Sequence, residues 1–340
     1  MAFVSSNDVG AVVAIIGATG AVGKDLIEAL CEGDFPLKGL VLFTSLRSGN
    51  ELTEVDGRRI RIHPTPDDLI EHPLLTDVDI VFFASPPEVI KKHGKALASE
   101  GFAVIDMGGV LAGKIPFSIE GIQENDDLFS EYRICCTPSA PALIASRVIA
   151  AVQHFGLRSL SGQVLLSAGC MGKQGIEELS QQVAALFGAK EPPRKVFPNG
   201  LAFDVISTFG NLQQGWTDPE RRVAIEVASL LKMSPKQIAL SLQVIPVFAG
   251  VILCGRISFL KEISHEDLVD AFSNGKQLEV GDPPPGPRRL VGRKSIYIGR
   301  IRKDPLEDCY HFWAAADNLR AGAVDNAILL AYHYWDQGLI

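Results

Sequence analysis

Three glycines spaced three residues apart form the clearest chemical pattern in this chain. Gly17, Gly20 and Gly23 directly follow the apolar run Ala11–Ile16, and the helical pattern Lys24–Glu32 comes next. In such a strand–turn–helix the first glycine turns the chain and the second lets the backbone approach a pyrophosphate. The third allows close packing of helix on strand. The pattern predicts a dinucleotide-binding turn made by Gly17, Thr19, Gly20, Ala21, Val22 and Gly23.

The glycine motif has two alternatives to a dinucleotide site. A tight turn without a ligand would need the same small residues. A P-loop is a poorer match, because that motif needs Ser or Thr after its lysine to hold magnesium, and here Asp25 follows Lys24. The placement between a strand and a helix therefore favours the dinucleotide site.

The residues after the second predicted strand indicate which dinucleotide is bound. A NAD site usually carries an acidic side chain there for the ribose hydroxyl. This chain carries Ser45, Arg47 and Ser48 instead. A guanidinium flanked by hydroxyls suits a 2′-phosphate, so we predict NADP as the cofactor. The alternative is that Arg47 is an ordinary solvated cation of a loop.

The cysteines are candidate nucleophiles and metal ligands. The chain has six, without C-x-x-C spacing, and each lies in or beside an apolar stretch. Reduced, buried thiols have this distribution, so we expect neither a disulfide framework nor a metal site. They are Cys31, Cys135, Cys136, Cys170, Cys254 and Cys309.

The elements that must position these residues alternate in the first third of the chain. Continuous apolar strands alternate with helical patterns, which is typical of a parallel sheet covered on both faces. We predict a doubly wound, Rossmann-like domain of the α/β class. Its strands and helices are expected at Ala11–Ile16, Lys24–Glu32, Leu40–Thr44, Val78–Ser85, Pro87–Ser99 and Ala103–Asp106.

Beyond residues 137–142 the pattern changes to runs of strands with fewer helices. This predicts an α+β domain with a mostly antiparallel or mixed sheet. Helices are expected at Leu143–Phe155, Gly175–Leu186, Pro219–Leu231 and Asn318–Trp335, with a long loop at Pro192–Phe209. Strands are expected at Gln163–Ser167, Ile238–Phe248, Cys254–Leu260, Ile296–Ile301 and Phe312–Ala316.

Length and charge exclude several classes of protein. The 340 residues suffice for about two domains of roughly 150 residues each. The 32 basic and 40 acidic residues give a net charge of −8, which argues against a general nucleic-acid binder. The uncharged runs are shorter than the ~18–20 residues of a membrane-spanning helix, and Met1–Asp8 has no basic residue typical of a signal peptide. We expect a cytoplasmic protein.

Five segments along the chain together carry a likeness to a known family. They are Gly17–Gly23, Ser45–Gly49, Gly172–Leu179, Pro246–Gly250 and Asp317–Ala323. The same segments occur in the same order in aspartate-semialdehyde dehydrogenase, and the likeness covers essentially the whole chain. The chain resembles this family, and in particular its divergent Usg-type paralogues.

The resemblance implies an NADP-binding domain over 1–138, completed by the C-terminal helix 318–340, and a catalytic and dimerisation domain over 139–317. It implies a homodimer or a larger assembly such as a tetramer. The family reaction, in amino-acid biosynthesis, converts aspartate β-semialdehyde and phosphate to β-aspartyl phosphate. A cysteine thiolate attacks the aldehyde, hydride passes to NADP, phosphate resolves the thioester, and a histidine serves as acid and base.

The chain departs from the family where this chemistry takes place. The nucleophile position falls on Ser139 or, with a shift of one residue, on Ala140. The histidine position falls on Val251. The sequence places no base beside Ser139, and Cys136 and Cys170 are the alternative nucleophiles. Further departures are Leu166 for a glutamine, Ala112 for a phosphate-binding arginine, and Pro86-Pro87 for a glycine pair.

Three site residues match the family. Glu226 matches the acid that meets the substrate amine, Arg222 a basic phosphate contact, and Asn318 a contact on the nicotinamide side. Glu226 and Arg222 also fit a surface ion pair, since they are four residues apart on one predicted helix.

Three functions follow as hypotheses. The first is a cofactor-binding homologue that has lost the standard chemistry. The second is an active semialdehyde or aldehyde dehydrogenase with a rearranged site. The third is a regulatory or partner-binding protein. Nucleotide binding separates the third from the others, and turnover separates the first two.

Overall fold

The computed structural model describes residues 3–4, 10–45, 51–55 and 57–340. By its internal contacts the chain divides into two compact units. The first comprises Met1–Pro138 with Ala323–Ile340, and the second comprises Ser139–Gly322.

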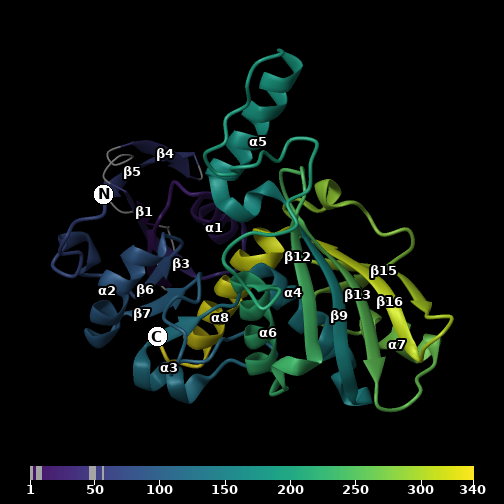
Figure 1. Ribbon diagram of the computed structural model, residues 1–340. Helices are drawn as coiled ribbons and strands as arrows, with labels where there is room; N and C mark the ends of the chain where they lie inside the picture. Colours follow the sequence, from purple (N-terminus) through teal and green to yellow (C-terminus); the bar gives the residue numbers. More distant parts are fainter. Residues whose placement is uncertain (1–2, 5–9, 46–50, 56) are drawn as a thin grey trace. The chain divides into compact units, whose positions relative to one another are not determined.

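The first unit is built on a sheet with strand order β4-β5-β3-β2-β6-β7-β8 (Figure 1). The strands from β5 to β8 pair in parallel, β4 pairs antiparallel with β5, and β1 pairs antiparallel with β3. The strands are β1 (Phe3–Val4), β2 (Ala11–Ile16), β3 (Leu37–Thr44), β4 (Leu52–Val55), β5 (Arg58–Pro64), β6 (Ile80–Phe83), β7 (Ala103–Asp106) and β8 (Ile134–Cys136). This is the Rossmann-like arrangement that the sequence predicts, and the prediction is confirmed.

The helices of this unit bury the apolar stripes that their sequences carry. Helix α1 (Ala21–Glu32) and the C-terminal α8 (Asp325–Asp336) contribute to one hydrophobic core with alternate residues of β2, β3, β6 and β7. The ring of Tyr334 stacks on that of Phe129 at 3.7 Å, which ties α8 to α3 (Asp126–Tyr132). Helix α2 (Pro87–Ser99) packs against β7.

The second unit contains a six-stranded mixed sheet with strand order β12-β9-β13-β16-β15-β14. The pairs β12–β9 and β14–β15 are parallel, and the other pairs are antiparallel. The strands are β9 (Leu157–Leu166), β12 (Ile238–Val244), β13 (Val251–Phe259), β14 (Leu278–Val280), β15 (Ile296–Lys303) and β16 (Cys309–Ala316).

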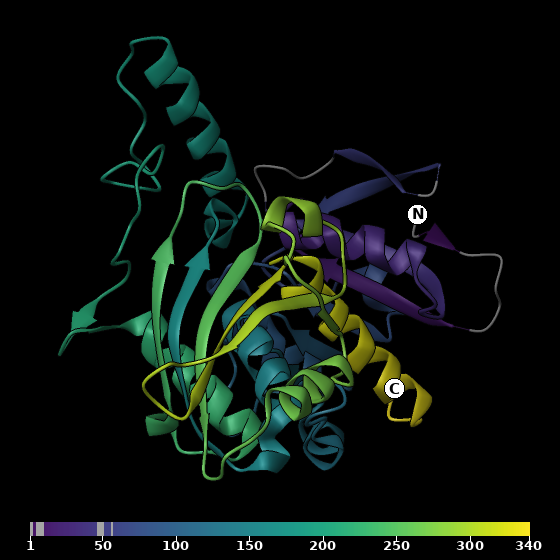
Figure 2. The ribbon, with the colours of Figure 1, turned by 90° about the vertical axis from the view of Figure 1, so that its right-hand side faces the viewer.

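Three helices pack on this sheet, and a fourth extends away from it (Figures 1 and 2). Those on the sheet are α4 (Ala140–Val152), α6 (Asp218–Leu231) and α7 (His265–Ser273). The extended helix is α5 (Gly172–Phe187), which follows the short turn η3 (Ala168–Met171). After α5 the chain forms a long loop up to the small pair β10 (Leu212–Gln213) and β11 (Trp216–Thr217).

Two buried polar side chains of α5 hold this loop. The Glu178 carboxylate accepts backbone N–H groups of residues 195, 196 and 197 at 2.8–2.9 Å. The Gln182 amide oxygen accepts those of Leu201 and Ala202 at 2.7 and 3.0 Å. Backbone N–H groups inside a protein need acceptors. In this loop Glu178 and Gln182 provide the acceptors that a helix or a sheet would otherwise provide.

Several predicted elements have different limits in the structure; the strand expected over Gln163–Ser167, for example, is Leu157–Leu166. For two of them the physical cause is local. The strand expected over Ile238–Phe248 ends at Val244, two residues before Pro246, which has no N–H to donate to a ladder. The helix expected from Asn318 begins at Asp325, after a π-helical turn at Arg320–Val324. The Asp317 carboxylate accepts the N–H of Leu319 at 2.7 Å and stabilises a turn there.

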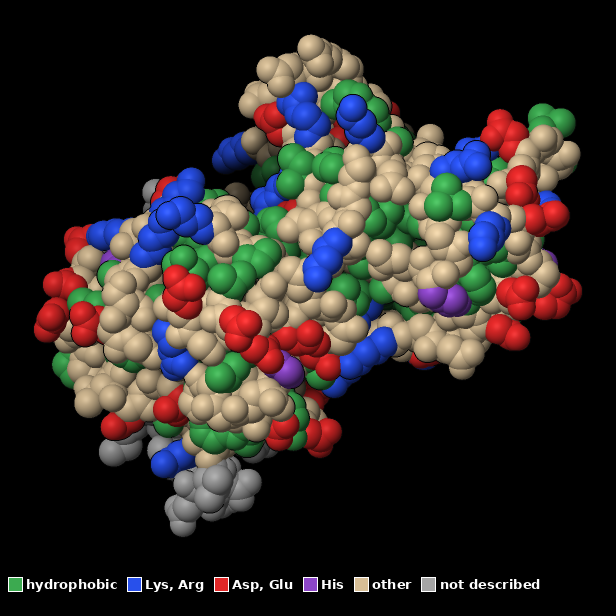
Figure 3. Space-filling view, turned by 90° about the horizontal axis from the view of Figure 1, so that it is seen from below, with side chains coloured by type: hydrophobic (Ala, Val, Ile, Leu, Met, Phe, Trp, Pro, Cys, Tyr) green, Lys and Arg blue, Asp and Glu red, His purple; other side chains and the backbone are tan. Residues whose placement is uncertain are grey.

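Figure 3 shows acidic and basic side chains interspersed over the face in view. Among the described residues, no helix is both long and apolar enough to span a membrane.

Candidate functional site

The glycine turn between β2 and α1 has the geometry that its sequence predicts. Gly17 adopts φ +100°, and a Cβ there would lie 2.3 Å from the backbone oxygen of Ala84. A Cβ on Gly23 would lie 2.2 Å from the backbone oxygen of Gly17. Side chains are therefore excluded at both positions.

Gly20 stands at the N-cap of α1 and carries no side chain that could cap the helix. The first turn of α1 has no acidic residue. The positive end of the helix dipole and its first N–H groups are thus left for an anion. This turn fits a dinucleotide pyrophosphate, which the N–H groups of Thr19, Ala21 and Val22 would hold.

The predicted phosphate-selective residues are only partly described. Thr19 and Thr44 share a hydrogen bond of 2.6 Å between their hydroxyls, at the end of β3. Ser45 follows and is exposed. Arg47 and Ser48 lie outside the described residues. Across the sheet, Pro86 and Pro87 occupy the N-terminus of α2, where neither has an N–H to offer.

Ser139 stands at the N-cap of α4 and is held by a buried carboxylate. Glu226 accepts both the backbone N–H and the hydroxyl of Ser139 through Oε2, at 3.0 and 2.5 Å. The other oxygen of Glu226, Oε1, accepts a hydrogen bond from Arg222 Nε at 2.5 Å. The side chain of Glu226 is 1% exposed and that of Arg222 is 48% exposed.

This Ser139–Glu226–Arg222 group corrects two expectations. The sequence placed no base beside Ser139, yet the Glu226 carboxylate lies within hydrogen-bond distance of its hydroxyl. The ion pair of Glu226 with Arg222 exists, but it is not a surface pair, because the carboxylate is buried. Sequence reasoning missed the contact because Ser139 and Glu226 are 87 residues apart.

Two residues that the resemblance assigns to the family's glutamine and histidine positions, Leu166 and Val251, are paired in the second sheet. Leu166 at the end of β9 pairs with Val251 at the start of β13 and with Val244 at the end of β12. All three side chains are buried. This row therefore presents only hydrocarbon and contains no group that can accept or donate a proton.

Asn318 lies at a junction of three segments in the second unit. Its Oδ1 accepts the N–H of Gly250 at 2.6 Å and lies 3.5 Å from the hydroxyl of Ser167. A Cβ on Gly169 would lie 3.3 Å from Asn318 Nδ2. The side chain is thus fixed against the turn that joins β9 to α5.

The two alternative nucleophiles, Cys136 and Cys170, and the neighbouring Cys135 all have thiols with raised pKa values. Desolvation raises the pKa of the buried Cys135 to about 12. It raises the pKa of Cys136 further, and the Asp106 carboxylate 3.8 Å from its sulfur adds to the shift. Cys170 is exposed as a residue, but desolvation raises the pKa of its thiol to about 11. Reactive cysteines have lowered pKa values instead.

Asp106 ends β7 and organises the loop that follows it. Its carboxylate accepts the N–H groups of Gly108 and Leu111 at 3.1 and 2.7 Å. Desolvation raises its pKa, against the effect of these donors. Ala112, which the resemblance assigns to the position of the family's phosphate-binding arginine, follows this turn and is partly buried.

Three residues of metal-ligand type come together at the end of the β15–β16 hairpin. Within the described chain, Asp304, Cys309 and His311 have ligand atoms within 4.8 Å of one another. A hydrogen bond from His311 at 2.6 Å lowers the pKa of Asp304 to about 2, helped by two backbone N–H groups. His311 on β16 lies between Arg256 on β13 and Arg302 on β15, which are its partners in the sheet. Their positive charge opposes a dication, so the group is better explained as an ion-pair network.

Two family descriptions match the chain. Residues 12–116 match "Semialdehyde dehydrogenase, NAD binding domain", and residues 150–321 match "Semialdehyde dehydrogenase, dimerisation domain". The protein belongs to the semialdehyde dehydrogenase family, and the resemblance noted from the sequence is confirmed.

Similar proteins include both branches named from the sequence. A USG-1 protein homolog from Pseudomonas aeruginosa is 28% identical over 328 residues, which cover 94% of this chain and 96% of that protein. An aspartate-semialdehyde dehydrogenase from Aquifex aeolicus is 27% identical over 343 residues, covering 96% and 99%. The crystal structure of aspartate semialdehyde dehydrogenase II from Vibrio cholerae has the same fold, with a TM-score of 0.90 at 24% identity, over 96% of this chain and 99% of that one.

Proposed function

We propose that this protein is an NADP-binding homologue of aspartate-semialdehyde dehydrogenase that does not perform the phosphorylating oxidation of aspartate β-semialdehyde. The observation that carries the proposal is the pair of residues that the resemblance assigns to the nucleophile and histidine positions: Ser139 has a hydroxyl in place of a thiol, and Val251 is buried beside apolar neighbours. The family reaction needs a thiolate there and an imidazole nearby.

The chemistry of the Ser139 hydroxyl supports a loss of the standard reaction. A hydroxyl is much harder to ionise than a thiol, and an alkoxide is a poorer leaving group than a thiolate. The histidine position holds Val251, whose neighbours in the sheet are also apolar. Losing a positioned acid–base group typically costs ~10²–10⁴ in rate, and losing the nucleophile adds to this.

The remaining thiols do not replace the nucleophile. Cys135 and Cys136 are strand residues of β8 and are buried, and the net shifts in their pKa values disfavour the thiolate. Cys170 lies in the η3 turn, where its thiol also has a raised pKa. Ala112 further weakens phosphate capture, because Arg222 would have to hold the anion alone.

NADP binding is proposed from the glycine turn and from Ser45, Arg47 and Ser48. When bound, NADP would supply a hydride acceptor. The N–H groups of Thr19, Ala21 and Val22 would hold its pyrophosphate, and Arg47 its 2′-phosphate. A charge-assisted contact of ~1.5–3 kcal/mol gives a preference over NAD of roughly tenfold to a hundredfold. Calorimetric titration in which NAD binds as tightly as NADP would exclude this part.

The decisive experiment measures NADPH formation from the semialdehyde, phosphate and NADP. The natural protein should show no useful turnover, and the Ser139→Cys/Val251→His variant should gain activity. Ser139→Cys/Val251→Leu is the matched control, since it has the thiol without the imidazole. Circular dichroism checks that the buried imidazole is tolerated. Turnover of the natural protein at ~1 s⁻¹ or faster, within the usual enzyme range, would overturn the proposal.

A second candidate function is an active dehydrogenase with a rearranged site. The short hydrogen bond from the Ser139 hydroxyl to Glu226 favours it, because the carboxylate stands where a base would stand. Under this hypothesis Ser139→Ala and Glu226→Gln would each abolish turnover of a suitable aldehyde. If the protein binds neither NADP nor NAD, a regulatory or partner-binding role is left.

We also propose that the protein forms a homodimer or larger assembly through the sheet of its second unit. Leu165, Cys254, Tyr297 and Trp313 lie on the strands as partly buried hydrophobic residues of one cluster. A second copy that covers this cluster would remove the rest of its apolar surface from water. Light scattering that gives a mass near 36.7 kDa at micromolar concentration would contradict the proposal.

A further inference from the structure

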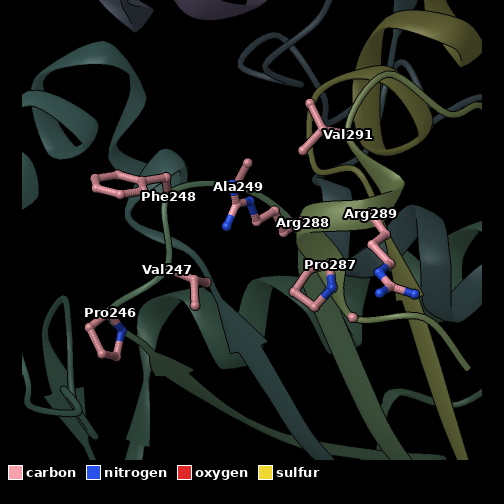
Figure 4. A pocket seen from close by; sticks show the side chains of 9 residues that line it. Pro246, Val247, Phe248, Ala249, Pro287, Arg288, Arg289 and Val291 are labelled. Atoms are coloured by element: carbon pink, nitrogen blue, oxygen red, sulfur yellow. The ribbon is translucent and has the colours of Figure 1, made fainter.

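A cavity of about 590 Å³ lies in the second unit, and neither Ser139 nor Glu226 lines it. Figure 4 shows its lining side chains. One wall is the turn that follows β12. The other is the segment around the short helix η5 (Pro287–Leu290). The lining residues are Pro246, Val247, Phe248, Ala249, Gly286, Pro287, Arg288, Arg289 and Val291.

The lining combines hydrocarbon with positive charge. Phe248 and Val291 are 49% and 56% exposed, so their apolar surface is open to a ligand. Figure 4 shows Arg288 extending from η5 toward the Pro246–Ala249 turn. Neither Arg288 nor Arg289 has an ion-pair partner within the part of the chain that the structure describes. The volume is within the range of small-molecule sites, and guanidinium groups suit carboxylate, sulfonate or phosphate.

The two walls of this cavity are tied to adjacent residues at the end of β16. The N–H of Gly250, at the end of the first wall, donates to Asn318 Oδ1 at 2.6 Å. The N–H of Gly292, at the end of the second wall, donates to Asp317 Oδ2 at 2.6 Å. The walls also touch, since a Cβ on Gly250 would lie 2.4 Å from the Cβ of Pro287.

The first wall also holds the turn that joins β9 to α5. Carbonyl oxygens of Val247, Phe248 and Gly250 accept the N–H groups of three successive residues of this turn, at 2.8, 3.2 and 3.2 Å. The donors are, in the same order, Ala168, Gly169 and Ser167. A molecule that fixes the two walls therefore also fixes Asn318 and this turn.

We propose that this cavity is a binding site for a small organic anion, with an apolar body against Pro246, Val247 and Phe248 and its anionic group on Arg288. Arg289 adds to the positive charge at the rim. Binding is coupled to the Ser167–Gly169 turn through the hydrogen bonds of the wall.

Binding is tested with the full chain and anilinonaphthalene sulfonate, which has an apolar body and one anionic group. We expect one site per chain. Arg288→Ala/Arg289→Ala should weaken the affinity about tenfold or more, the effect of losing a charge-assisted contact. Arg158→Ala/Lys261→Ala is the matched control: it removes the same charge from two exposed residues outside the cavity and should leave the affinity unchanged.

Two competitors identify the anionic group. Benzoate and phenyl phosphate share the ring and differ in the anion, so displacement by one rather than the other assigns a carboxylate or a phosphate ligand. Displacement by both supports an anion site without this selectivity. Failure of both to displace the probe at millimolar concentration would overturn the proposal.

Coupling is tested by hydrogen exchange at the amides of residues 167–169 and 250. A ligand at a hundred times its Kd should slow their exchange by up to about a hundredfold, and it should do so less in Arg288→Ala/Arg289→Ala. Unchanged exchange with the probe bound would overturn the coupling.

The mass of the assembly is measured in parallel by sedimentation. If the double variant changes the mass of the assembly and the probe does not bind, a second copy of the chain fills the cavity and the anion site is refuted. None of these measurements requires NADP, so the anion site can fail or hold whatever the outcome for dinucleotide binding. The sedimentation also tests the proposed assembly, because Leu290 of η5 belongs to its apolar cluster.

Discussion

The hydrogen bond between Ser139 and Glu226 gives the most direct test of the site geometry. Glu226 is buried and accepts three donors, of which the Ser139 hydroxyl is one. A hydrogen bond to a charged group contributes ~1.5–3 kcal/mol to stability. We therefore expect Ser139→Ala to lower the free energy of unfolding of the second unit by about this amount. The helix cap is not lost, because the Ser139 side chain does not cap α4.

A double-mutant cycle separates this hydrogen bond from other effects. In Glu226→Gln the NH2 group of the new amide must face either Ser139 or Arg222. The Ser139 or Arg222 donor that it faces then loses the oxygen that accepted its hydrogen bond. Removing one partner of a buried pair costs ~3–5 kcal/mol, and the half-exposed Arg222 places this case at the lower end. The double variant should cost less than the sum of the two single variants by roughly 1 kcal/mol or more.

The assay is urea unfolding followed by tryptophan fluorescence. Of the three tryptophans, Trp335 lies in the first unit, so a Trp335→Phe background leaves Trp216 and Trp313 as reporters of the second. The control cycle uses Lys173 and Glu177, an exposed pair at 3.5 Å on α5. Its coupling should be ~0.3–0.5 kcal/mol. A Ser139–Glu226 coupling no larger than that of the control would refute our account of the buried carboxylate.

Three further outcomes follow from the structure. Gly17→Ala should lower the melting temperature and abolish dinucleotide binding, because the added Cβ would lie 2.3 Å from the backbone oxygen of Ala84. Gly20→Ala should leave the fold intact, because the nearest atom to its added Cβ is at 3.3 Å. Desolvation raises the pKa of Glu178, but the N–H groups of residues 195–197 and the Gln182 amide outweigh it and lower the pKa below 4.5. Protection of those amides from hydrogen exchange should therefore be complete above pH 4.5, and it should be lost as the pH falls through the lowered pKa of Glu178. If the amides stay protected in Glu178→Gln, the carboxylate is not what holds them. Iodoacetamide at pH 8 should label Cys170 more slowly than free cysteine, and rapid labelling would restore it as a nucleophile candidate.

The strand–turn–helix of the cofactor domain was predictable from local sequence alone. The Gly17–Gly23 motif and the apolar periods on either side of it depend on neighbours within a few residues. Backbone sterics exclude a side chain at Gly17 whatever the rest of the chain does. The alternation of strands and helices predicted the parallel sheet of the first unit, because it also depends on residues that are close together in the sequence.

Element boundaries were predicted less well than element types. The strand ending at Val244 and the helix beginning at Asp325 are set by a proline and by a side-chain hydrogen bond of Asp317. Both are local, but hydrophobic periodicity does not report them.

The sequence by itself determined the family and the class of fold, since these depend on residue types in order along the chain, and it predicted Ser139 and Val251 at the family's cysteine and histidine positions. Only the tertiary structure placed Glu226 on Ser139 across 87 residues, and paired Leu166 with Val251 in one apolar row. It also buried the thiol of Cys136 and placed Asp106, 30 residues away in sequence, beside it, and both raise the pKa of the thiol. Hydrogen bonds, desolvation and charge depend on distances in space, and residues distant in sequence come within those distances only when the chain folds.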